Sequence, residues 1–235
     1  MPLSKLSAAL TAVDWNKNVA AFLSDGAAAK SIAEKNLRIA IWAKQLESSD
    51  KGNPALCFIR EMQMAGQHVA ALVSLALYKP AAASMRTMFE TALYYTYFRS
   101  HPSELVTLVR SSEYFVDKRE LLEYHKRHTP DYPKLQKALG LNSRIEAWYS
   151  AVSSVVHGQI PGTWLEHKSL SEIAPIKTTQ QLVLMKFREG EEIVHRLLLC
   201  TAGKQMWDTF SPPAKQKLLH GLSGKLRTTL ALDLA

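Results

Sequence analysis

Cysteine and long apolar runs are scarce in this sequence. The 235 residues include only two cysteines, Cys57 and Cys200, which argues against a disulfide framework and fits a reducing compartment. No stretch approaches the ~20 apolar residues that a membrane helix needs, and the apolar part of the first ten residues is too short for a signal peptide. We therefore expect a cytoplasmic protein with no membrane partner.

Several motifs of enzymes and metal sites are also missing. No glycine-rich phosphate loop occurs, and no serine stands in the nucleophile-elbow spacing. The glycine-rich segment 221–225 lacks the Walker spacing and a preceding strand, so we interpret it as a turn. His125 and His128 share a helix face and could ligate zinc, but no second ligand pair accompanies them. We read them as a solvated helix end and expect neither a metal nor a cofactor.

The composition is that of a globular helical protein. The apolar fraction is 47% and the charged fraction 21%, helix-forming residues dominate, and β-branched runs are few. Ser31 and Glu34 form the pattern of a capping box, and Pro80 directly after an apolar segment predicts a long helical hairpin. We expect an all-α, single-domain bundle with helices at 31–47, 54–78, from Pro80 onward, and at 101–127, 130–139, 142–157 and 178–209, then a small C-terminal helix.

Basic residues outnumber acidic ones, 29 to 21, which gives a formal net charge of +8. A basic balance describes partners rather than fold. Nucleic acid is one candidate partner, and an anionic membrane surface or an acidic protein are others. The basic residues are spread along the chain, so the charge alone does not choose between them.

Two segments combine residue types and spacings that favour a polar site. Arg86 and Glu90 lie four residues apart on the second arm of the hairpin and so share a helix face. Tyr149, Ser153 and His157 recur every four residues before Gly158 and share a face of another predicted helix. Since a buried charge needs a partner, Arg86 and Glu90 are expected to pair.

This combination resembles the HEPN superfamily of bacterial helical proteins, and most closely its uncharacterised branches, over roughly residues 54–161. The resemblance implies a helical core at 53–161, flanked by N-terminal helices in 1–52 and C-terminal helices in 162–235. It also implies a homodimer whose protomers line a shared cleft with an Arg and a His. Many members are metal-independent ribonucleases of toxin–antitoxin and phage-defence (antiviral defence) systems, whereas others only bind nucleotide, RNA or protein.

The chain departs from the superfamily's pattern of Arg, four to six residues, then His. His157 has no arginine at that spacing, whereas Arg119 with His125 and Arg188 with His195 match it, as chance alone explains. We keep Arg119 and His125 as the weaker alternative pair. Arg119 and His125 lie in a strongly charged segment in which both are expected to face water.

The resemblance places His157 as the candidate base and Arg86 as the candidate phosphate ligand. Glu90 then orients Arg86, while Tyr149 and Ser153 set the orientation of the imidazole. A histidine can deprotonate a ribose 2′-hydroxyl and a guanidinium can stabilise the phosphorane, so the expected product is a 2′,3′-cyclic phosphate. The expected partners are RNA and a cognate antitoxin or defence-system protein.

Two other interpretations stay open. The chain could be a non-catalytic module of the same fold that binds RNA or protein, or a regulator that binds a nucleotide near Arg86. In either case Arg86 and Glu90 could simply be a structural ion pair, and His157 could cap a helix end. The aromatic group at residues 94–98 favours a core or dimer interface over base stacking.

Overall fold

A helical hairpin forms the centre of the molecule. The computed structural model describes residues 2–164 and 167–232. The two arms are α4 (Leu56–Ser74) and α5 (Tyr78–Phe98), which pack against each other along their length. On α4 the buried apolar residues recur at helical spacing, as at Met62, Ala65 and Val69. The predicted hairpin is therefore confirmed.

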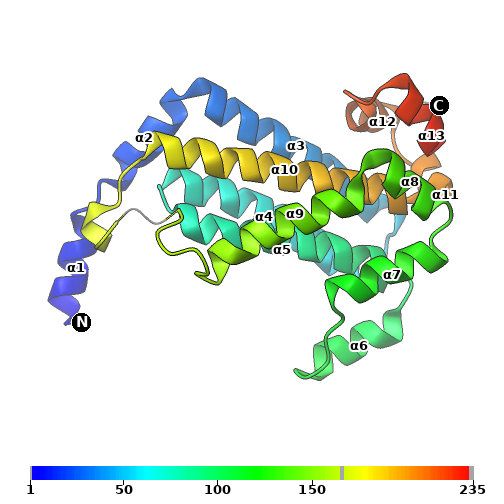
Figure 1. Cartoon of the computed structure of the whole chain (residues 1–235), viewed down its shortest axis with the longest axis horizontal. Coiled ribbons are helices and arrows are strands. Elements are labelled where there is room, and N and C mark those ends of the chain that lie inside the picture. The colour runs from blue at the N-terminus through cyan, green and yellow to red at the C-terminus, as the bar shows by residue number, and fades with distance from the viewer. Residues whose placement is uncertain (1, 165–166, 233–235) are drawn as a thin grey trace.

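Three further long helices complete the bundle. They are α3 (Gly26–Ser49), α9 (Leu141–Val156) and α10 (Lys177–Thr201), and they run alongside the hairpin (Figure 1). The last of them, α10, contacts α5, α3 and α9 and contributes fully buried side chains such as Phe187 and Leu197. The prediction of an all-α, single-domain bundle is confirmed. No strand occurs within residues 2–164 or within residues 167–232.

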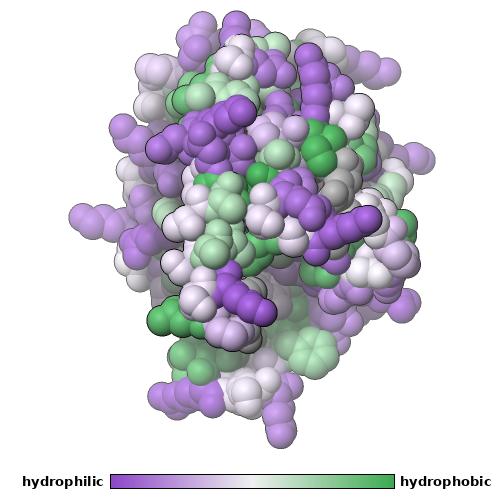
Figure 2. Space-filling model, turned by 90° about the vertical axis from the view of Figure 1, so that its left-hand side faces the viewer, coloured by the Kyte–Doolittle hydropathy of each residue, from purple (hydrophilic) through white to green (hydrophobic). Residues whose placement is uncertain are grey.

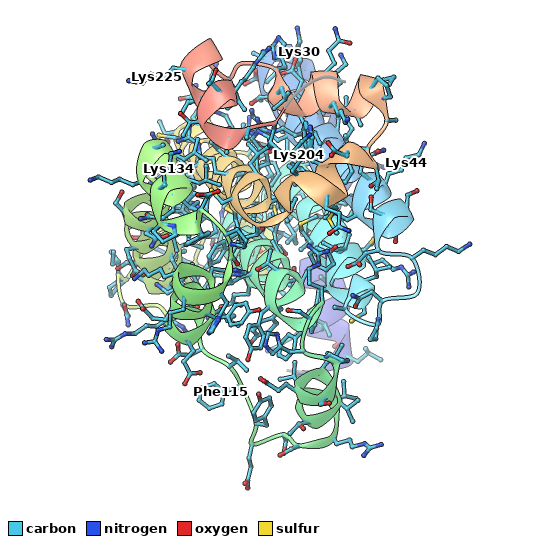
Figure 3. The ribbon with its side chains drawn as sticks, turned by 90° about the vertical axis from the view of Figure 1, so that its right-hand side faces the viewer. Lys30, Lys44, Phe115, Lys134, Lys204 and Lys225 are labelled. Carbon is cyan, nitrogen blue, oxygen red and sulfur yellow. The ribbon has the colours of Figure 1, made fainter. Side chains whose placement is uncertain are left out.

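Shorter helices cover the two ends of the bundle. At one end lie α1 (Leu3–Thr11) and α2 (Trp15–Ser24), and the 3₁₀ turn η1 (Leu170–Glu172) contacts α1. Near the other end lie α8 and the C-terminal helices (Figures 1 and 3). Their bounds are α8 (Tyr132–Leu139), α11 (Gly203–Asp208), α12 (Pro212–Leu219) and α13 (Gly224–Leu230).

Three predicted helices have wrong boundaries. The helix expected over 178–209 is two helices, α10 and α11, because the chain turns at Gly203, whose φ is +72°. The helix expected from residue 31 starts at Gly26, because the Asp25 side chain accepts the Ala28 N–H and caps it there. The single helix expected over 101–127 is two helices, α6 (Pro102–Arg110) and α7 (Lys118–His128). Asp117 and Glu120 form a complete capping box that starts the second.

The remaining predictions about small motifs hold in part. Segment 221–225 is a turn into α13, as predicted, and Ser223 caps that helix. Cys57 is exposed and Cys200 buried, and neither forms a disulfide; burial raises the pKa of the Cys200 thiol to about 12. None of the described helices is both long and apolar enough to span a bilayer.

Candidate functional site

The centre of the candidate site is an arginine on α5. The Arg86 guanidinium donates from Nε (3.2 Å) and Nη2 (2.7 Å) to Oε1 of Glu90, one helical turn further along. Their side chains are 21% and 34% exposed, so the pair is half-buried rather than enclosed. Residues four apart on a helix lie on the same face, and the ion pair predicted from that spacing between Arg86 and Glu90 is present.

Helix α9 brings two further groups to this pair. The Tyr149 hydroxyl donates to Glu90 Oε1 at 2.6 Å and accepts from Arg86 Nη2 at 2.8 Å. His157, at the C-terminal end of α9, places its Nε2 atom 2.8 Å from Arg86 Nη1. Four of the five residues predicted from the two segments therefore meet, although the bonded residues of α5 and α9 are 59 to 71 positions apart in sequence.

The contact between Arg86 and His157 is a hydrogen bond in one tautomer of the ring. A guanidinium is always a donor, so Nε2 must accept with a lone pair. The imidazole in this arrangement is therefore neutral, with its proton on Nδ1. An unprotonated ring nitrogen beside a cation is the form that a general base requires.

Ser153 does not join the hydrogen-bonded group. Its Oγ atom is buried and has no hydrogen-bond partner among residues 2–164 and 167–232. Tyr149 likewise bonds to Arg86 and Glu90 and not to the imidazole. The structure thus assigns the ring's contact to Arg86, whereas the sequence predicted that Tyr149 and Ser153 orient it.

Electrostatics favour a charged arginine and a protonated tyrosine. Desolvation alone would lower the pKa of Arg86, but hydrogen bonds and the charge of Glu90 outweigh it and raise that pKa. Burial, followed by the hydrogen bond to Glu90, raises the pKa of Tyr149 to about 12. Tyr149 therefore remains a neutral hydroxyl, able to donate to Glu90 at any physiological pH.

Two lysines near the site were missed by sequence reasoning. Lys118 Nζ lies 4.7 Å from the centroid of the Tyr149 ring while it pairs with Glu146. Lys79 Nζ lies 3.6 Å from the point that a Cβ atom at Gly158 would occupy. Lys79 precedes Arg86 by seven residues, a helical repeat that could have revealed it, but no local signal connects Lys118 to Tyr149.

The weaker alternative pair is not assembled. His125 is 1% exposed, and both ring nitrogens contact threonine hydroxyls at 2.8 Å, those of Thr96 and Thr129. Burial, with a smaller contribution from His101, lowers its pKa to about 4. Arg119 is exposed and, six residues away, lies on another face of α7. The expectation that His125 faces water is wrong, because its side chain packs into the core.

Arg188 and His195, the second pair that matches the superfamily's spacing of Arg and His, are not brought together either. His195 is buried, and Trp42 Nε1 donates to its Nδ1 atom at 3.0 Å, whereas Arg188 is exposed. Within the described ranges, no cluster of three or more His, Cys, Asp or Glu side chains could hold a metal ion.

Comparison with protein-family models, curated proteins and solved structures finds no match for this chain.

Proposed function

We propose that this protein is a HEPN-like, metal-independent endoribonuclease whose reaction takes place at Arg86 and His157. The observation that carries the proposal is the 2.8 Å contact between Arg86 Nη1 and the unprotonated Nε2 of His157. A guanidinium and a neutral imidazole in contact supply an anion ligand and a base for phosphoryl transfer. His157 is exposed, so a polymeric substrate can reach it.

The reaction follows from these two groups. His157 Nε2 takes the proton of a ribose 2′-hydroxyl, and the 2′-oxygen forms a bond to the adjacent phosphorus. The bond from phosphorus to the 5′-oxygen breaks, and that oxygen takes a proton from water. The products are a 2′,3′-cyclic phosphate and a 5′-hydroxyl end, and the imidazolium returns its proton to water. Arg86 stabilises the negative charge of the phosphorane.

Substrate binding must rearrange the contact described above. The Nε2 lone pair that would take the proton is occupied by Arg86 in the free protein. A phosphate that draws Nη1 away from the ring frees this lone pair, while Glu90 and Tyr149 keep hold of Nη2. The base thus becomes available when a phosphate arrives.

The proposal includes the biological setting that the resemblance implies. The protein acts in the cytoplasm as a homodimeric toxin or phage-defence effector, with RNA as substrate and a cognate antitoxin or defence-system protein as partner. The net charge of +8 supports an anionic substrate.

A specific observation favours a second candidate, a non-catalytic module of the same fold that binds RNA, nucleotide or protein. Glu90 already neutralises Arg86 through two hydrogen bonds to one carboxylate oxygen, and this carboxylate competes with a phosphate for the guanidinium. In this case the four side chains stabilise the contact between α5 and α9 and bind an anion without transferring its phosphoryl group.

The test is cleavage of a mixed RNA substrate by the purified full chain in excess EDTA. We expect cleavage by the parent protein and its loss in His157→Ala and in Arg86→Ala, with folding intact by circular dichroism. His68→Ala and Arg119→Ala are matched controls, since both residues are exposed and lie outside the site. No cleavage by the parent protein, with RNA still bound, supports the binding module instead.

A further inference from the structure

An apolar hollow lies beside the candidate site. Its volume is about 560 Å³, and it is formed by α1, the turn between α4 and α5, and the segment after α9. The apolar part of its wall includes Leu77, Tyr78, Trp164, Leu170 and Ile173. These elements lie at the end of the molecule that faces the viewer in Figure 2, where hydrophobic and hydrophilic surfaces adjoin. A hollow of this size and polarity suits a small organic group.

Basic side chains line this hollow. Lys79 and Lys168 line it together with His167, and the Glu172 carboxylate lies next to it, where it accepts from the Lys168 N–H and the Ser169 hydroxyl. Four other surface hollows each include at least one Asp or Glu side chain. An apolar wall with a basic rim selects a ligand that joins an apolar group to an anion.

Two residues of the wall have a strained backbone. Ala76 and Trp164 have φ angles of +61° and +60°, in the left-handed region that L residues seldom adopt. Such strain persists only where the surroundings impose it, and it concentrates at ligand sites. In this case the strained residues belong to two segments that line one hollow, the hairpin turn and the chain after α9.

Lys79 connects the hollow to Arg86 and His157. It lines the hollow and approaches Gly158, the residue directly after His157. Gly158 has a φ of +66° and no Cβ, so the chain turns there while the lysine passes close by. Lys79 and Arg86 are about 10 Å apart along α5. No salt bridge neutralises Lys79 among the described residues.

We propose that the hollow and Lys79 form a subsite for the nucleotide that flanks the reacting phosphate. The base of that nucleotide enters the hollow, and its phosphate binds Lys79, while the neighbouring phosphate binds Arg86. This inference rests on the proposed function, since it takes RNA as the strand that reaches both places. A continuous strand fits better than a free nucleotide, because the basic groups extend from the hollow to His157.

The test is binding of a fluorescently labelled single-stranded oligonucleotide with 2′-O-methyl sugars, which cannot be cleaved. We expect Lys79→Gln to reduce the salt dependence of binding by about one phosphate contact. Leu170→Asp, which places a carboxylate at the hollow, should weaken binding by about fivefold or more. The matched controls are Lys17→Gln and Leu182→Asp, because Leu182 is 40% exposed and Leu170 is 41% exposed.

A second set of probes identifies the occupant. Each probe is an oligonucleotide with one abasic position, and this position is moved stepwise along the strand. The parent protein should bind one probe of the series more weakly than the others. Leu170→Asp should bind all of them equally. Unchanged affinity in both Lys79→Gln and Leu170→Asp, with circular dichroism intact, overturns the subsite. Equal affinity for 5′-AMP and for the oligonucleotide overturns it in favour of a small-ligand site.

The two proposals fail in different ways. His157-dependent cleavage in EDTA with no effect of Lys79→Gln or Leu170→Asp on binding leaves the ribonuclease and removes the subsite. Absence of cleavage, with binding that depends on Lys79 and Leu170, removes the catalytic proposal and leaves a strand-binding site.

Discussion

At the scale of single residues, the Tyr149 hydroxyl connects the groups of the candidate site. It is bonded to both Arg86 and Glu90, and the guanidinium carbon lies 5.0 Å from the ring centroid. Tyr149→Phe keeps the ring and removes both hydrogen bonds, so we expect a loss of about 1 kcal/mol in the free energy of unfolding and slower RNA cleavage. Urea denaturation and the EDTA cleavage assay measure the two effects.

Tyr94 provides the matched control for this change. It is half-buried on the same helix, and its hydroxyl forms no hydrogen bond with the residues that the structure describes. Tyr94→Phe should therefore leave stability within about 0.5 kcal/mol of the parent and cleavage unchanged. Equal effects of the two substitutions contradict a specific role for Tyr149.

The buried histidines predict how stability depends on pH. Burial lowers the pKa of His125 to about 4 and that of His195 to about 3, from a model-peptide value of 6.5. The unfolded chain therefore binds more protons in this window, and stability falls as the pH drops from about 7 toward 4. Each histidine should cost about 2 kcal/mol between about pH 7.5 and pH 5, as urea denaturation at the two pH values can measure.

A pair of substitutions isolates this effect. His125→Asn should reduce the difference in stability between the two pH values, even though the variant is less stable throughout. His128→Asn, at an exposed position on the same helix, should leave the difference as it is in the parent. A pH difference that stays the same in His125→Asn would show that other groups cause the acid sensitivity.

Individual residues of the site were predictable where helical repeats place them. Arg86 with Glu90, and Tyr149 with His157, follow from spacings of four and eight on two helices. The contact between those helices depends on packing, for which no local pattern exists. His125 shows the reverse case, since a strongly charged segment suggested an exposed side chain although one face of α7 is buried.

At the scale of elements, the contact between α9 and α10 depends on one glycine. A Cβ atom at Gly190 would lie within 2.7 Å of two ring carbons of Trp148, whose Nε1 donates to the Lys186 carbonyl at 2.8 Å. Gly190→Ala should therefore reduce the free energy of unfolding by about 1–3 kcal/mol, despite the better helix propensity of alanine. Gly26→Ala has open space and should be neutral or stabilising.

A buried ion pair joins α3 to α10. Arg38 donates to both carboxylate oxygens of Glu191, which is 1% exposed, and also to Glu192. Glu191→Gln should reduce the free energy of unfolding by about 3 kcal/mol, because Arg38 loses its buried partner and keeps only Glu192. Glu47→Gln removes an exposed pair with Arg60 and should cost less than about 1 kcal/mol in the same denaturation measurement.

At the scale of elements, the sequence predicts which segments form helices better than it predicts where each helix begins and ends. The apolar repeat, with Pro54 and Pro80 near the helix starts, located the hairpin, and Gly158 marked the end of the segment that forms α9. The pattern at Asp117 and Glu120 was sufficient to divide the helix expected over 101–127, but the continuous amphipathic repeat obscured it.

At the scale of the whole molecule, positive charge is distributed rather than gathered into one patch. The lysines labelled in Figure 3 come from α3, α8, α11 and α13, and they extend outward in different directions. Positive charge distributed in this way attracts a polyanion from many directions. Local groups such as Arg86 and Lys79 must then position the bound polyanion.

The proposed homodimer is also tested at this scale. The chain has a mass of 26.3 kDa, and light scattering of the purified protein at micromolar concentration should give twice that value. Exposed apolar side chains such as Phe115 (71%) and Val109 (80%) are available to such a contact. A monomer mass throughout the concentration range would remove the dimer from the proposal.

The separation of the site residues in sequence has a consequence for synthesis of the protein. Arg86 leaves the ribosome 71 residues before His157, and α9 finds its packing partner α10 only later still. A nascent or truncated chain that ends before α9 lacks the imidazole, so it cannot cleave the message that encodes it. Under the proposed activity, a chain released before residue 157 is inactive, so premature termination in that part of the message cannot produce an active enzyme.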